Sequence, residues 1–497
     1  MSKLTHADWE QHAQQLKIEG RAFINGEYTH AASGATFECI SPVDGRHLAN
    51  VASCDLADAN RAVENARATF DSGVWSRLAP AKRKVVMIRF AALLNEHAQE
   101  LALLETLDMG KPISDSLYID VPGAAQALSW SGEAIDKIYD EVAATPHDQL
   151  GLVTREPVGV VAAIVPWNFP LMMACWKLGP ALSTGNSVVL KPSEKSPLTA
   201  VRVAQLAIEA GLPKGVLNVV PGYGHTIGKA LALHLDVDTV VFTGSSKIAK
   251  QLLIYAGESN MKRVWLEAGG KSPNIVFADA PDLQAAAESA ASAIAFNQGE
   301  VCTAGSRLLV ERSIKDAFLP LVIEALKGWK PGNPLDPATT IGALVDTQQM
   351  NTVLSYIEAG HQGGAKLVAG GKRILEETGG TYVEPTIFDG VDNAMRIAQE
   401  EIFGPVLSVI TFDTADEAIR IANDTPYGLA AGVWTSDISK AHLTARALRA
   451  GSVWVNQYDA GDMTAPFGGF KQSGNGRDKS LHAFDKYTEL KSTWIKL

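Results

Sequence analysis

The sequence predicts an α/β fold built on parallel sheets, and three observations carry this prediction. From residue 158 onward, short runs rich in valine and isoleucine recur, including VGVVAAIV, SVVLKP, VLNVV and TVVFTG. Helical segments of about 10–15 residues separate these runs, with glycine or proline at the joints, which is the pattern of βαβ units. The third observation is size, because 497 residues, 46% of them hydrophobic and 20% charged, can form roughly three globular units with large cores.

The N-terminal part of the chain is predicted to be helical before the sheet begins. Residues 56–110 are rich in alanine, and their apolar residues recur at spacings of three and four, as in amphipathic helices. Residues 157–176 then contain one polar residue, Asn168, and approach the length of a membrane span. Because three prolines interrupt this stretch, we expect a buried strand, a turn and a helix instead.

A second series of strands and helices follows. SPNIVFADA, SRLLVERS, VLSVITF and GSVWVN are strand-like, and a helix is expected over residues 283–297. The tail, YTELKSTWIKL, alternates like a strand. An exposed terminal strand needs a partner edge, so the tail hints at subunit association.

Charge and cysteine content exclude several classes of function. The formal net charge of −11 disfavours non-specific binding to nucleic acid or to an anionic membrane, and leaves a cationic ligand open. The four cysteines form no CxxC pair, so neither a disulfide framework nor a bound metal is expected. The start, MSKLTHADWEQHAQQ, lacks the apolar core of a signal peptide, and we expect a cytoplasmic protein.

The segment FNQGEVCTAG, residues 296–305, contains the first candidate for chemistry. Cys302 follows a predicted helix and lies between Gly299 and Gly305, where a turn-rich backbone can approach a ligand closely. A thiol of ordinary pKa is only a few per cent thiolate at neutral pH, yet that fraction is strongly nucleophilic. The alternative is a buried structural thiol, because free cysteines are among the most buried residues.

Two further segments carry candidate polar groups next to apolar runs. In VWLEAGGKSPN, Glu267 ends a strand-like run before two glycines, which indicates either a perturbed carboxyl in a cleft or a strand-end residue facing water. In PWNFP, Asn168 is held between aromatic residues and prolines. Its amide is a candidate donor to a developing oxyanion, and a turn-forming role is the alternative.

Two strand–turn–helix transitions indicate a nucleotide site. In VVLKPSEKSP, Lys191 and Glu194 follow the carboxyl end of a strand, where open α/β sheets bind nucleotides. In VVFTGSSKIAK, Gly244 and Ser245 open a helix whose N-terminus can meet a phosphate. The glycines around Gly224 resemble a dinucleotide fingerprint only weakly.

Together, eight ordered motifs resemble the NAD(P)-dependent aldehyde dehydrogenase superfamily. They are PWNFP, LKPSE, FTGS, LEAGGKSPN, FNQGEVCTAGSR, EEIFGPV, NDTPYGLAAGV and PFGGFKQSG. The resemblance extends from about residue 20 to the C-terminus. It implies a Rossmann-like cofactor domain (1–129 and 158–266), an α/β catalytic domain (267–478) and a small β oligomerisation arm (130–157 and 479–497) that makes a homodimer or homotetramer.

The resemblance also implies a mechanism. The Cys302 thiolate attacks the aldehyde, while the Asn168 amide and the Cys302 backbone N–H hold the oxyanion. Hydride departure leaves a thioester, and Glu267 activates the water that hydrolyses it. Lys177 and Asp478 match positions tied to proton handling in relatives. Asp478 stands where relatives often have glutamate, which leaves its relay role open.

The cofactor that the resemblance implies is NAD. Glu194 would repel a 2′-phosphate and so disfavours NADP. Two departures from the family pattern, Ala249 and Ala268, stand where the backbone is expected to act. The expected cofactor contacts are Pro166, Trp167, Lys191, Ser193, Glu194, Gly224, Phe242, Gly244, Ser245, Glu401 and Phe403.

Acidic and aromatic residues around the expected aldehyde tunnel indicate a cationic substrate tail. The loop 456–466 carries Gly461 where several relatives have a bulky aromatic, so a wider entrance is expected. Charge and cation–π contact would favour an ω-aminoaldehyde of polyamine breakdown, with a non-selective acidic loop as the alternative. The expected substrate contacts are Asp120, Phe169, Met173, Trp176, Glu300, Val301, Thr303, Tyr458, Asp459, Asp462 and Phe467.

Other functions stay open on the sequence alone. A broad-specificity aliphatic aldehyde dehydrogenase has the same motifs, and a cysteine hydrolase without cofactor could use Cys302. None of the eleven histidines lies in the motif segments, so a Cys–His pair has no local support. A non-catalytic protein with this fold would be expected to lack Cys302, Glu267 or Asn168, and all three are present. In a CoA-dependent enzyme CoA releases the thioester, so the presence of Glu267 argues for release by water.

Overall fold

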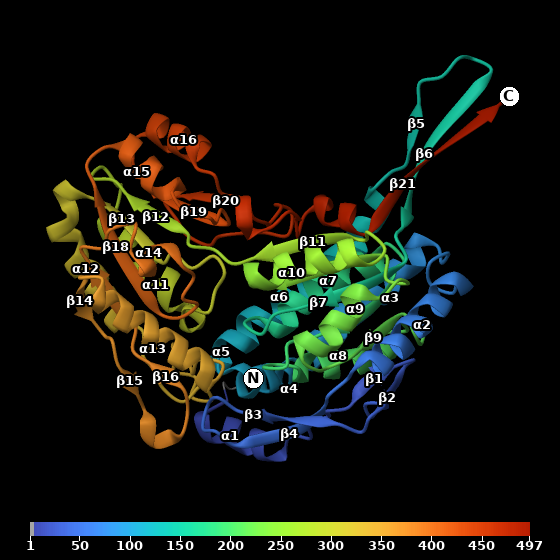
Figure 1. Cartoon of the computed structure of the whole chain (residues 1–497), viewed down its shortest axis with the longest axis horizontal. Coiled ribbons are helices and arrows are strands. Elements are labelled where there is room, and N and C mark those ends of the chain that lie inside the picture. The colour runs from blue at the N-terminus through green and yellow to red at the C-terminus, as the bar shows by residue number, and fades with distance from the viewer. Residues whose placement is uncertain (1–3) are drawn as a thin grey trace.

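A computed structural model describes residues 4–497 and contains two seven-stranded sheets side by side (Figure 1). In the first sheet the strand order is β11-β10-β7-β8-β9-β1-β2. Strands β7 to β11 are parallel, while β1 pairs antiparallel with β9 and with β2. The strands are β1 (Ala22–Ile24), β2 (Glu27–Thr29), β7 (Val160–Ile164), β8 (Ser187–Lys191), β9 (Leu217–Val219), β10 (Thr239–Gly244) and β11 (Arg263–Ala268).

Helices cover both faces of this sheet, which explains why its strands are almost uniformly apolar. In β7, Val161 and Ala163 belong to one core, and the alternate residues Val160 and Ala162 belong to another. Helices α3, α4, α6, α7 and α8 contribute to the first core, and α2, α9 and α10 to the second. Their bounds are α2 (Leu56–Ser72), α3 (Pro80–Glu96), α4 (Ala98–Met109), α6 (Val121–Ala134), α7 (Pro170–Ser183), α8 (Leu198–Glu209), α9 (Lys229–Leu233) and α10 (Ser246–Glu258).

The expected elements of this half are confirmed. The amphipathic helices predicted over residues 56–110 are α2, α3 and α4. Residues 157–176 form the end of β6, then β7, a turn and the start of α7. Within residues 4–497 no helix is both long and apolar enough to cross a membrane.

The strand order creates a crevice at the carboxyl ends of β7 and β10. The chain runs from β7 through β8 to β9 in one direction, then returns to place β10 on the other side of β7. The loops that leave β7 and β10 therefore diverge. Such a switch point is where open α/β sheets bind their ligands.

The second sheet has the order β14-β17-β18-β13-β12-β19-β20, and β14 is its one antiparallel strand. Its strands are β12 (Pro273–Val276), β13 (Arg307–Glu311), β14 (Lys366–Ala369), β17 (Thr386–Asp389), β18 (Val406–Phe412), β19 (Ala430–Trp434) and β20 (Ser452–Val455). The surrounding helices are α11 (Leu283–Ala295), α12 (Lys315–Lys327), α13 (Thr347–Gln362), α14 (Arg396–Gln399), α15 (Ala415–Asn423) and α16 (Ile438–Ala447). The helix expected over 283–297 ends two residues early, because Asn297 and Gln298 adopt left-handed backbone conformations.

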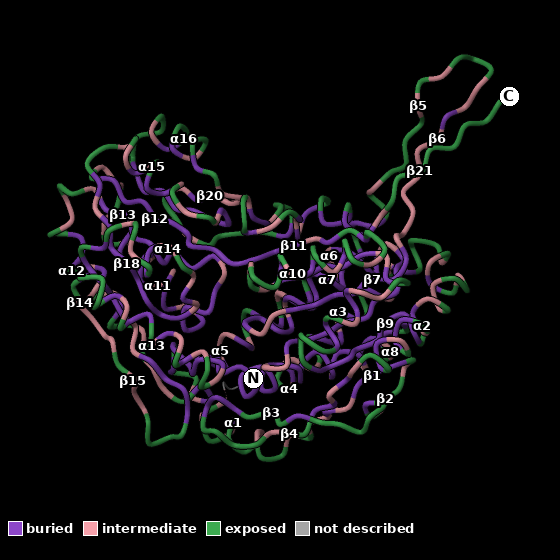
Figure 2. The backbone as a smooth tube through the Cα atoms, in the orientation of Figure 1, coloured by how far each residue is buried: buried purple, intermediate pink, exposed green. Residues whose placement is uncertain are grey.

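A three-stranded sheet projects from the body and carries the C-terminus (Figure 1). It contains β5 (Glu141–Ala143), β6 (Gln149–Pro157) and β21 (Thr488–Lys496), in the order β21-β6-β5. The predicted terminal strand is thus confirmed. Most of β21 is exposed (Figure 2), and one of its edges is unpaired among the described residues.

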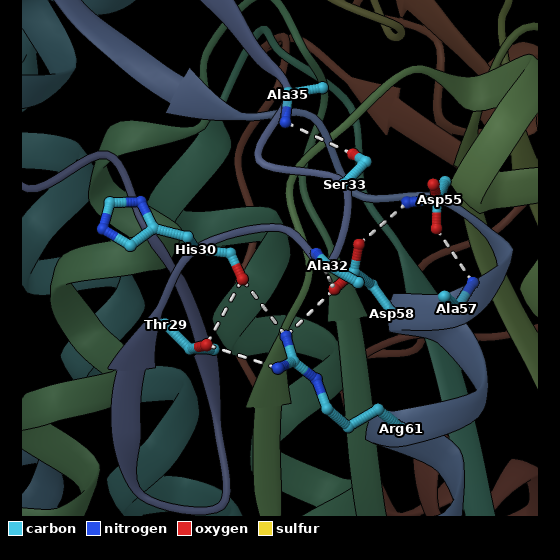
Figure 3. A network of polar contacts seen from close by, with 9 residues as sticks. All are labelled: Thr29, His30, Ala32, Ser33, Ala35, Asp55, Ala57, Asp58 and Arg61. Carbon is cyan, nitrogen blue, oxygen red and sulfur yellow. Dashed lines mark hydrogen bonds and ion pairs between the residues drawn. The ribbon is translucent and has the colours of Figure 1, made fainter.

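The remaining elements are short or lie outside the two large sheets. They are α1 (His6–Gln15), β3 (Thr36–Ile40), β4 (His47–Ala52), α5 (Ile113–Asp115), β15 (Arg373–Ile374), β16 (Tyr382–Val383) and short 3₁₀ or π turns. A polar network ties the segment after β2 to the start of α2 (Figure 3). Asp58 is fully buried and accepts hydrogen bonds from the Ala32 backbone N–H and from Arg61, both at 2.9 Å.

Candidate active site

The main cavity, about 1110 Å³, lies between the two large sheets. The segments that follow β7, β10 and β11 line it from the first sheet, at the carboxyl ends of those strands. The loops that lead into β13, β18 and β20 line it from the second sheet. The cavity therefore occupies the crevice that the topology creates.

Cys302 lines this cavity from a tightly constrained loop. Asn297, Gln298 and Gly299 have φ values of 47°, 56° and 72°, so three successive residues are left-handed. A Cβ on Gly299 would lie 2.4 Å from the Gly404 carbonyl, and one on Gly270 would lie 2.6 Å from the Cys302 carbonyl oxygen. The two glycines let the Cys302 loop approach the segments that carry Glu401 and Glu267.

The electrostatic surroundings disfavour an ionised thiol. Burial is the largest cause that raises the pKa of Cys302, and the nearby Glu267, Asp459 and Glu401 raise it further. In this state the thiol is protonated at neutral pH. Attack therefore requires removal of a proton or an added positive charge beside the sulfur.

Asn168 lies in the turn between β7 and α7 and lines the same cavity. Its Nδ2 donates a hydrogen bond to the Glu300 carbonyl oxygen at 2.9 Å, and Asn297 Nδ2 donates to the Asn168 carbonyl oxygen at 3.1 Å. An amide nitrogen has two N–H donors, so one stays available to the cavity. The first bond orients the side-chain amide of Asn168, and the second holds its backbone beside the Cys302 loop.

Glu267 ends β11 and is 4% exposed, with no hydrogen-bond partner on either carboxylate oxygen among the described residues. Burial, followed by the charge of Asp478, raises the pKa of Glu267 to about 8. The end of the strand is held by Asn475, whose Oδ1 accepts from the Leu266 N–H at 2.8 Å. Glu267 is thus mostly protonated near neutral pH. It loses its proton as the pH rises towards 8, and the carboxylate can then accept a proton from water.

Behind Glu267, the described residues form a buried cluster of two lysines and one aspartate. Lys177 Nζ lies 2.5 Å from Asp478 Oδ2, and Lys486 pairs with Asp478 Oδ1. Burial alone would raise the pKa of Asp478, but the two lysines lower it to about 2. Asp478 therefore carries a negative charge between the two lysines.

Six of the expected cofactor residues line the cavity. Ser245 is the N-cap of α10, and its Oγ accepts from the Ile248 N–H at 3.4 Å. Glu401 Oε1 accepts from the Gly270 N–H at 3.1 Å, and a Cβ on Gly269 would lie 1.9 Å from Glu401 Oε2. A side chain at position 269 would therefore displace the Glu401 carboxylate. The six residues are Pro166, Trp167, Gly244, Ser245, Glu401 and Phe403.

The other five expected cofactor residues lie outside this cavity. Lys191 Nζ and Glu194 Oε2 pair at 2.9 Å beyond the end of β8. Ser193 lies between them, and Gly224 opens a short π turn. Phe242 is buried, and its ring lies against Gly244, so it supports the cavity wall from behind.

The expected substrate residues fall into two groups. Most of them line the part of the cavity near Cys302: Phe169, Met173, Trp176, Val301, Thr303, Asp459, Asp462 and Phe467. Asp459 Oδ1 accepts from the Thr303 hydroxyl at 3.2 Å. Sequence reasoning missed other lining residues, including Met172, Phe296, Trp454 and Lys479.

Three expected substrate residues are corrected by the structure, because their side chains are used elsewhere. Asp120 is buried and pairs with Lys111, whose charge needs a counter-ion, while the neighbouring Tyr118 and Ile119 line the cavity. Glu300 is buried, and its Oε1 accepts from the Val345 N–H at 3.0 Å.

Tyr458 is the third correction. Its hydroxyl donates to the Thr303 carbonyl oxygen at 2.7 Å, so the side chain supports the Cys302 loop and does not line the cavity. The Trp176 ring, where a cationic substrate tail was expected, already has a cation of the protein beside it. Lys479 Nζ already lies 4.5 Å from the centroid of that ring.

No group of three or more histidine, cysteine or acidic side chains within residues 4–497 is arranged to hold a metal ion.

A crevice at the switch point of an α/β sheet, lined by a cysteine, an amide and a buried carboxyl, is the arrangement expected of an oxidoreductase that binds a nucleotide cofactor. The sequence profile of the aldehyde dehydrogenase family matches residues 28–493, so the chain belongs to that family. It oxidises aldehydes. The fold class and the resemblance seen in the eight motifs are confirmed.

Three relatives are particularly similar. The structure of the C302A mutant of Pseudomonas syringae AldA indole-3-acetaldehyde dehydrogenase, in complex with NAD⁺ and IAA, has 88% identity and a TM-score of 0.99, with 100% of both chains covered. The structure of γ-glutamyl-γ-aminobutyraldehyde dehydrogenase from Burkholderia cenocepacia J2315 has 63% identity and a TM-score of 0.98, covering 99% of this chain and 100% of that one. The NADP/NAD-dependent aldehyde dehydrogenase PuuC of Escherichia coli K12 is 58% identical over 491 residues, 99% of this chain and 98% of that protein.

Proposed function

We propose that this protein oxidises an aldehyde to a carboxylic acid with NAD, through a thioester on Cys302. The observation that carries the proposal is that Cys302, Asn168 and Glu267, from three separate segments, line one cavity together with Ser245 and Glu401. An aldehyde cannot release hydride readily until a nucleophile has made its carbon tetrahedral, so the covalent step comes first.

In the first step, the Cys302 thiol gives its proton to a water molecule in the cavity, and its sulfur bonds to the aldehyde carbon. The carbonyl electron pair moves to oxygen, where the free N–H of Asn168 and the backbone N–H of Cys302 can donate hydrogen bonds. Hydride then leaves the carbon and the C=O bond re-forms, which gives the thioester. Bound NAD supplies the acceptor for this hydride.

In the second step, Glu267 takes a proton from water, and the hydroxide formed attacks the thioester carbonyl. The C–S bond breaks, the acid departs and the sulfur leaves as thiolate. The two unpartnered oxygens of Glu267 fit a base that holds a water only during this step.

Residues already described fit NAD. The N-terminus of α10 at Ser245 can meet the pyrophosphate, and Glu401 can accept from ribose hydroxyls. Lys191 and Glu194 stand where the adenine ribose is expected, and the partly exposed Glu194 carboxylate opposes a 2′-phosphate. We propose that Lys177 acts indirectly. It pairs with Asp478, and its positive charge lowers the pKa of Glu267.

For the substrate, we propose an aldehyde derived from a polyamine, the ω-aminoaldehyde class. Asp459 and Asp462 in the cavity wall support it, as does the relative named for γ-glutamyl-γ-aminobutyraldehyde. A second candidate is indole-3-acetaldehyde, which the relative at 88% identity and the aromatic lining favour. A broad aliphatic specificity is the remaining alternative.

One assay tests the proposed reaction and ranks the substrates. Growth of absorbance at the reduced-nicotinamide band is followed with NAD and pentanal, 3-aminopropanal, 4-guanidinobutanal or indole-3-acetaldehyde, with and without CoA. We expect turnover without CoA, a higher kcat/KM for an amine-derived aldehyde than for pentanal, and none for Cys302→Ala. A requirement for CoA, or full activity of Cys302→Ala, would refute the proposal.

The assembly and location also belong to the proposal. The exposed arm of β5, β6 and β21 supports a homodimer or homotetramer. We further propose the cofactor, catalytic and arm domains with the boundaries given above, supported by the two large sheets and the three-stranded sheet. A cytoplasmic location is supported by the four unpaired cysteines and is tested by fractionation of cells.

A further inference from the structure

Lys479 is a cation in the wall of the substrate cavity. It lies directly after Asp478, and its Nζ is 4.5 Å from the ring centroid of Trp176 and 5.7 Å from that of Phe467. Both rings line the cavity near Cys302. The ammonium thus covers the aromatic surface that a substrate tail has to pass.

The donors of this ammonium are unused. None of the hydrogen bonds or ion pairs formed within residues 4–497 involves the Lys479 side chain, although nearby acids act on it by charge and an ammonium has three N–H donors. The two nearby acids have other partners: Asp459 accepts from the Thr303 hydroxyl, and Asp462 accepts from the Thr464 N–H at 2.8 Å. Lys479 therefore has donors to offer a ligand.

The backbone holds Lys479 in place. Lys479 and Ser480 have φ values of 55° and 49°, a left-handed conformation that side-chain-bearing residues rarely adopt. Hydrogen bonds fix both flanks: the Asp478 N–H donates to the Phe467 carbonyl at 2.7 Å, and the Ser480 N–H donates to the Met463 carbonyl at 2.7 Å. A strained conformation fixed on both sides is typical of a functional position.

Space for a ligand lies beside the ammonium. A Cβ placed on Gly461 would lie 3.6 Å from Lys479 Nζ and would meet no other atom within 4 Å. The wide entrance expected from Gly461 therefore opens next to the Lys479 donors. An oxygen acceptor can enter there, and the charge of Lys479 opposes the attraction that Asp459 and Asp462 exert on a cationic group.

We propose that Lys479 is a specificity-determining residue that donates a hydrogen bond to a carbonyl or carboxylate oxygen in the tail of the aldehyde. This inference rests on the proposed oxidation of amine-derived aldehydes and narrows it. An amine that carries an acyl group offers an amide oxygen and no positive charge at the acylated nitrogen. Lys479 therefore favours acylated aminoaldehydes and acid-tailed aldehydes over those that end in a bare ammonium.

The test compares aldehydes that differ in their tails. The probes are 4-acetamidobutanal, which carries an amide, 6-oxohexanoate, which carries a carboxylate, heptanal, which carries neither, and 3-aminopropanal, which carries an ammonium. The variants are Lys479→Met, Lys479→Gln and Lys479→Arg, and the matched control is Lys366→Met at an exposed position of β14.

We expect Lys479→Met to lower kcat/KM for an oxygen-tailed probe about tenfold, mainly through KM, with heptanal within about twofold of wild type. In Lys479→Met, kcat/KM for 3-aminopropanal should rise. Lys479→Arg should keep most of the wild-type preference for oxygen-tailed probes over heptanal, and the preference of Lys479→Gln should lie between those of Lys479→Arg and Lys479→Met. Loss for 4-acetamidobutanal alone identifies an amide as the acceptor, and loss for 6-oxohexanoate alone identifies a carboxylate.

Unchanged ratios among the four probes in Lys479→Met and Lys479→Gln would overturn the inference. An equal loss for all four, heptanal included, would also overturn it, because it would indicate a structural role. Failure of the proposed function looks different, since wild type would then oxidise none of the probes with NAD.

Discussion

At the scale of single residues, the site depends on two carboxyls whose pKa values are driven apart. Glu267 is buried without a partner and has its pKa raised to about 8, while Asp478, held by two lysines, has its pKa lowered to about 2. Because a raised carboxyl pKa favours the neutral form, Glu267 becomes an effective base only as the pH rises towards 8. Asp478 keeps its charge throughout this range.

The role of Lys486 can be tested through the pH dependence of turnover. Its positive charge lowers the pKa of Glu267, as do those of Lys177 and Arg477, against the opposing charge of Asp478. Lys486→Met should therefore raise the pKa of Glu267 and move the rising limb of kcat to higher pH, with kcat at pH 7 reduced about threefold to tenfold.

The measurement is a kcat profile from pH 6 to 9.5, with Lys366→Met as the control. A limb that stays in place while kcat drops at every pH would show that Lys486 acts on stability alone.

The sequence predicted which residues could carry the chemistry, but it did not predict where each side chain points. Cys302, Glu267 and Asn168 could be found because each stands beside turn residues at the end of an apolar run. Asp120 and Glu300 stand in equally suggestive places, yet both point into the protein, because Lys111 and the Val345 N–H need acceptors there. Such partners are distant in sequence or unmarked by any pattern.

At the scale of elements, strands were the easiest part to predict. The runs of valine and isoleucine became β7 to β10 because helices bury both faces of the sheet. The position of Lys479 was the hardest feature to predict, because Lys479 lies in an irregular segment whose conformation is set by backbone hydrogen bonds to Phe467 and Met463. No periodicity marks such a position.

The start of α2 illustrates how a polar group can hold an element. Asp58 Oδ2 accepts from the Asp55 N–H at 3.2 Å, and Oδ1 accepts from Ala32 and Arg61 (Figure 3). Asp58→Ala would leave the Ala32 and Asp55 N–H groups without an acceptor, while Arg61 keeps the His30 carbonyl, and we expect the free energy of unfolding to fall by about 2–3 kcal/mol. Thermal unfolding followed by fluorescence measures it as a lower Tm.

The control for this variant is Asp71→Ala, near the C-terminal end of the same helix, whose side chain is 62% exposed. It should change stability by less than about 0.5 kcal/mol. Equal Tm values for the two variants would contradict the importance of the network.

At the scale of the whole molecule, the projecting arm of β5, β6 and β21 exposes large apolar side chains that no other part of the same chain buries. Trp494 on β21 is 62% exposed, and Leu490 on the same strand is 60% exposed. Large apolar side chains at the edge of a projecting sheet are typical of a surface that a second copy covers.

We expect Trp494→Glu to shift the protein to smaller species in light scattering after size exclusion, because aromatic residues dominate the energy of such contacts. The control is Ile438→Glu. Ile438 is an exposed apolar residue on α16, away from the arm, and its substitution should leave the mass of the assembly unchanged. A wild-type protein that is monomeric at micromolar concentration would contradict the predicted assembly.

The central claim is that the oxidised substrate passes through a covalent bond to one sulfur. The most direct measurement is intact-mass spectrometry of Glu267→Gln mixed with NAD and pentanal, followed by peptide mapping. Because this variant lacks the base for hydrolysis, the account predicts that one pentanoyl group accumulates on Cys302 while about one equivalent of reduced nicotinamide forms. An unmodified protein that still produces reduced nicotinamide, or an acyl group found on Cys39, Cys54 or Cys175 instead, would contradict it.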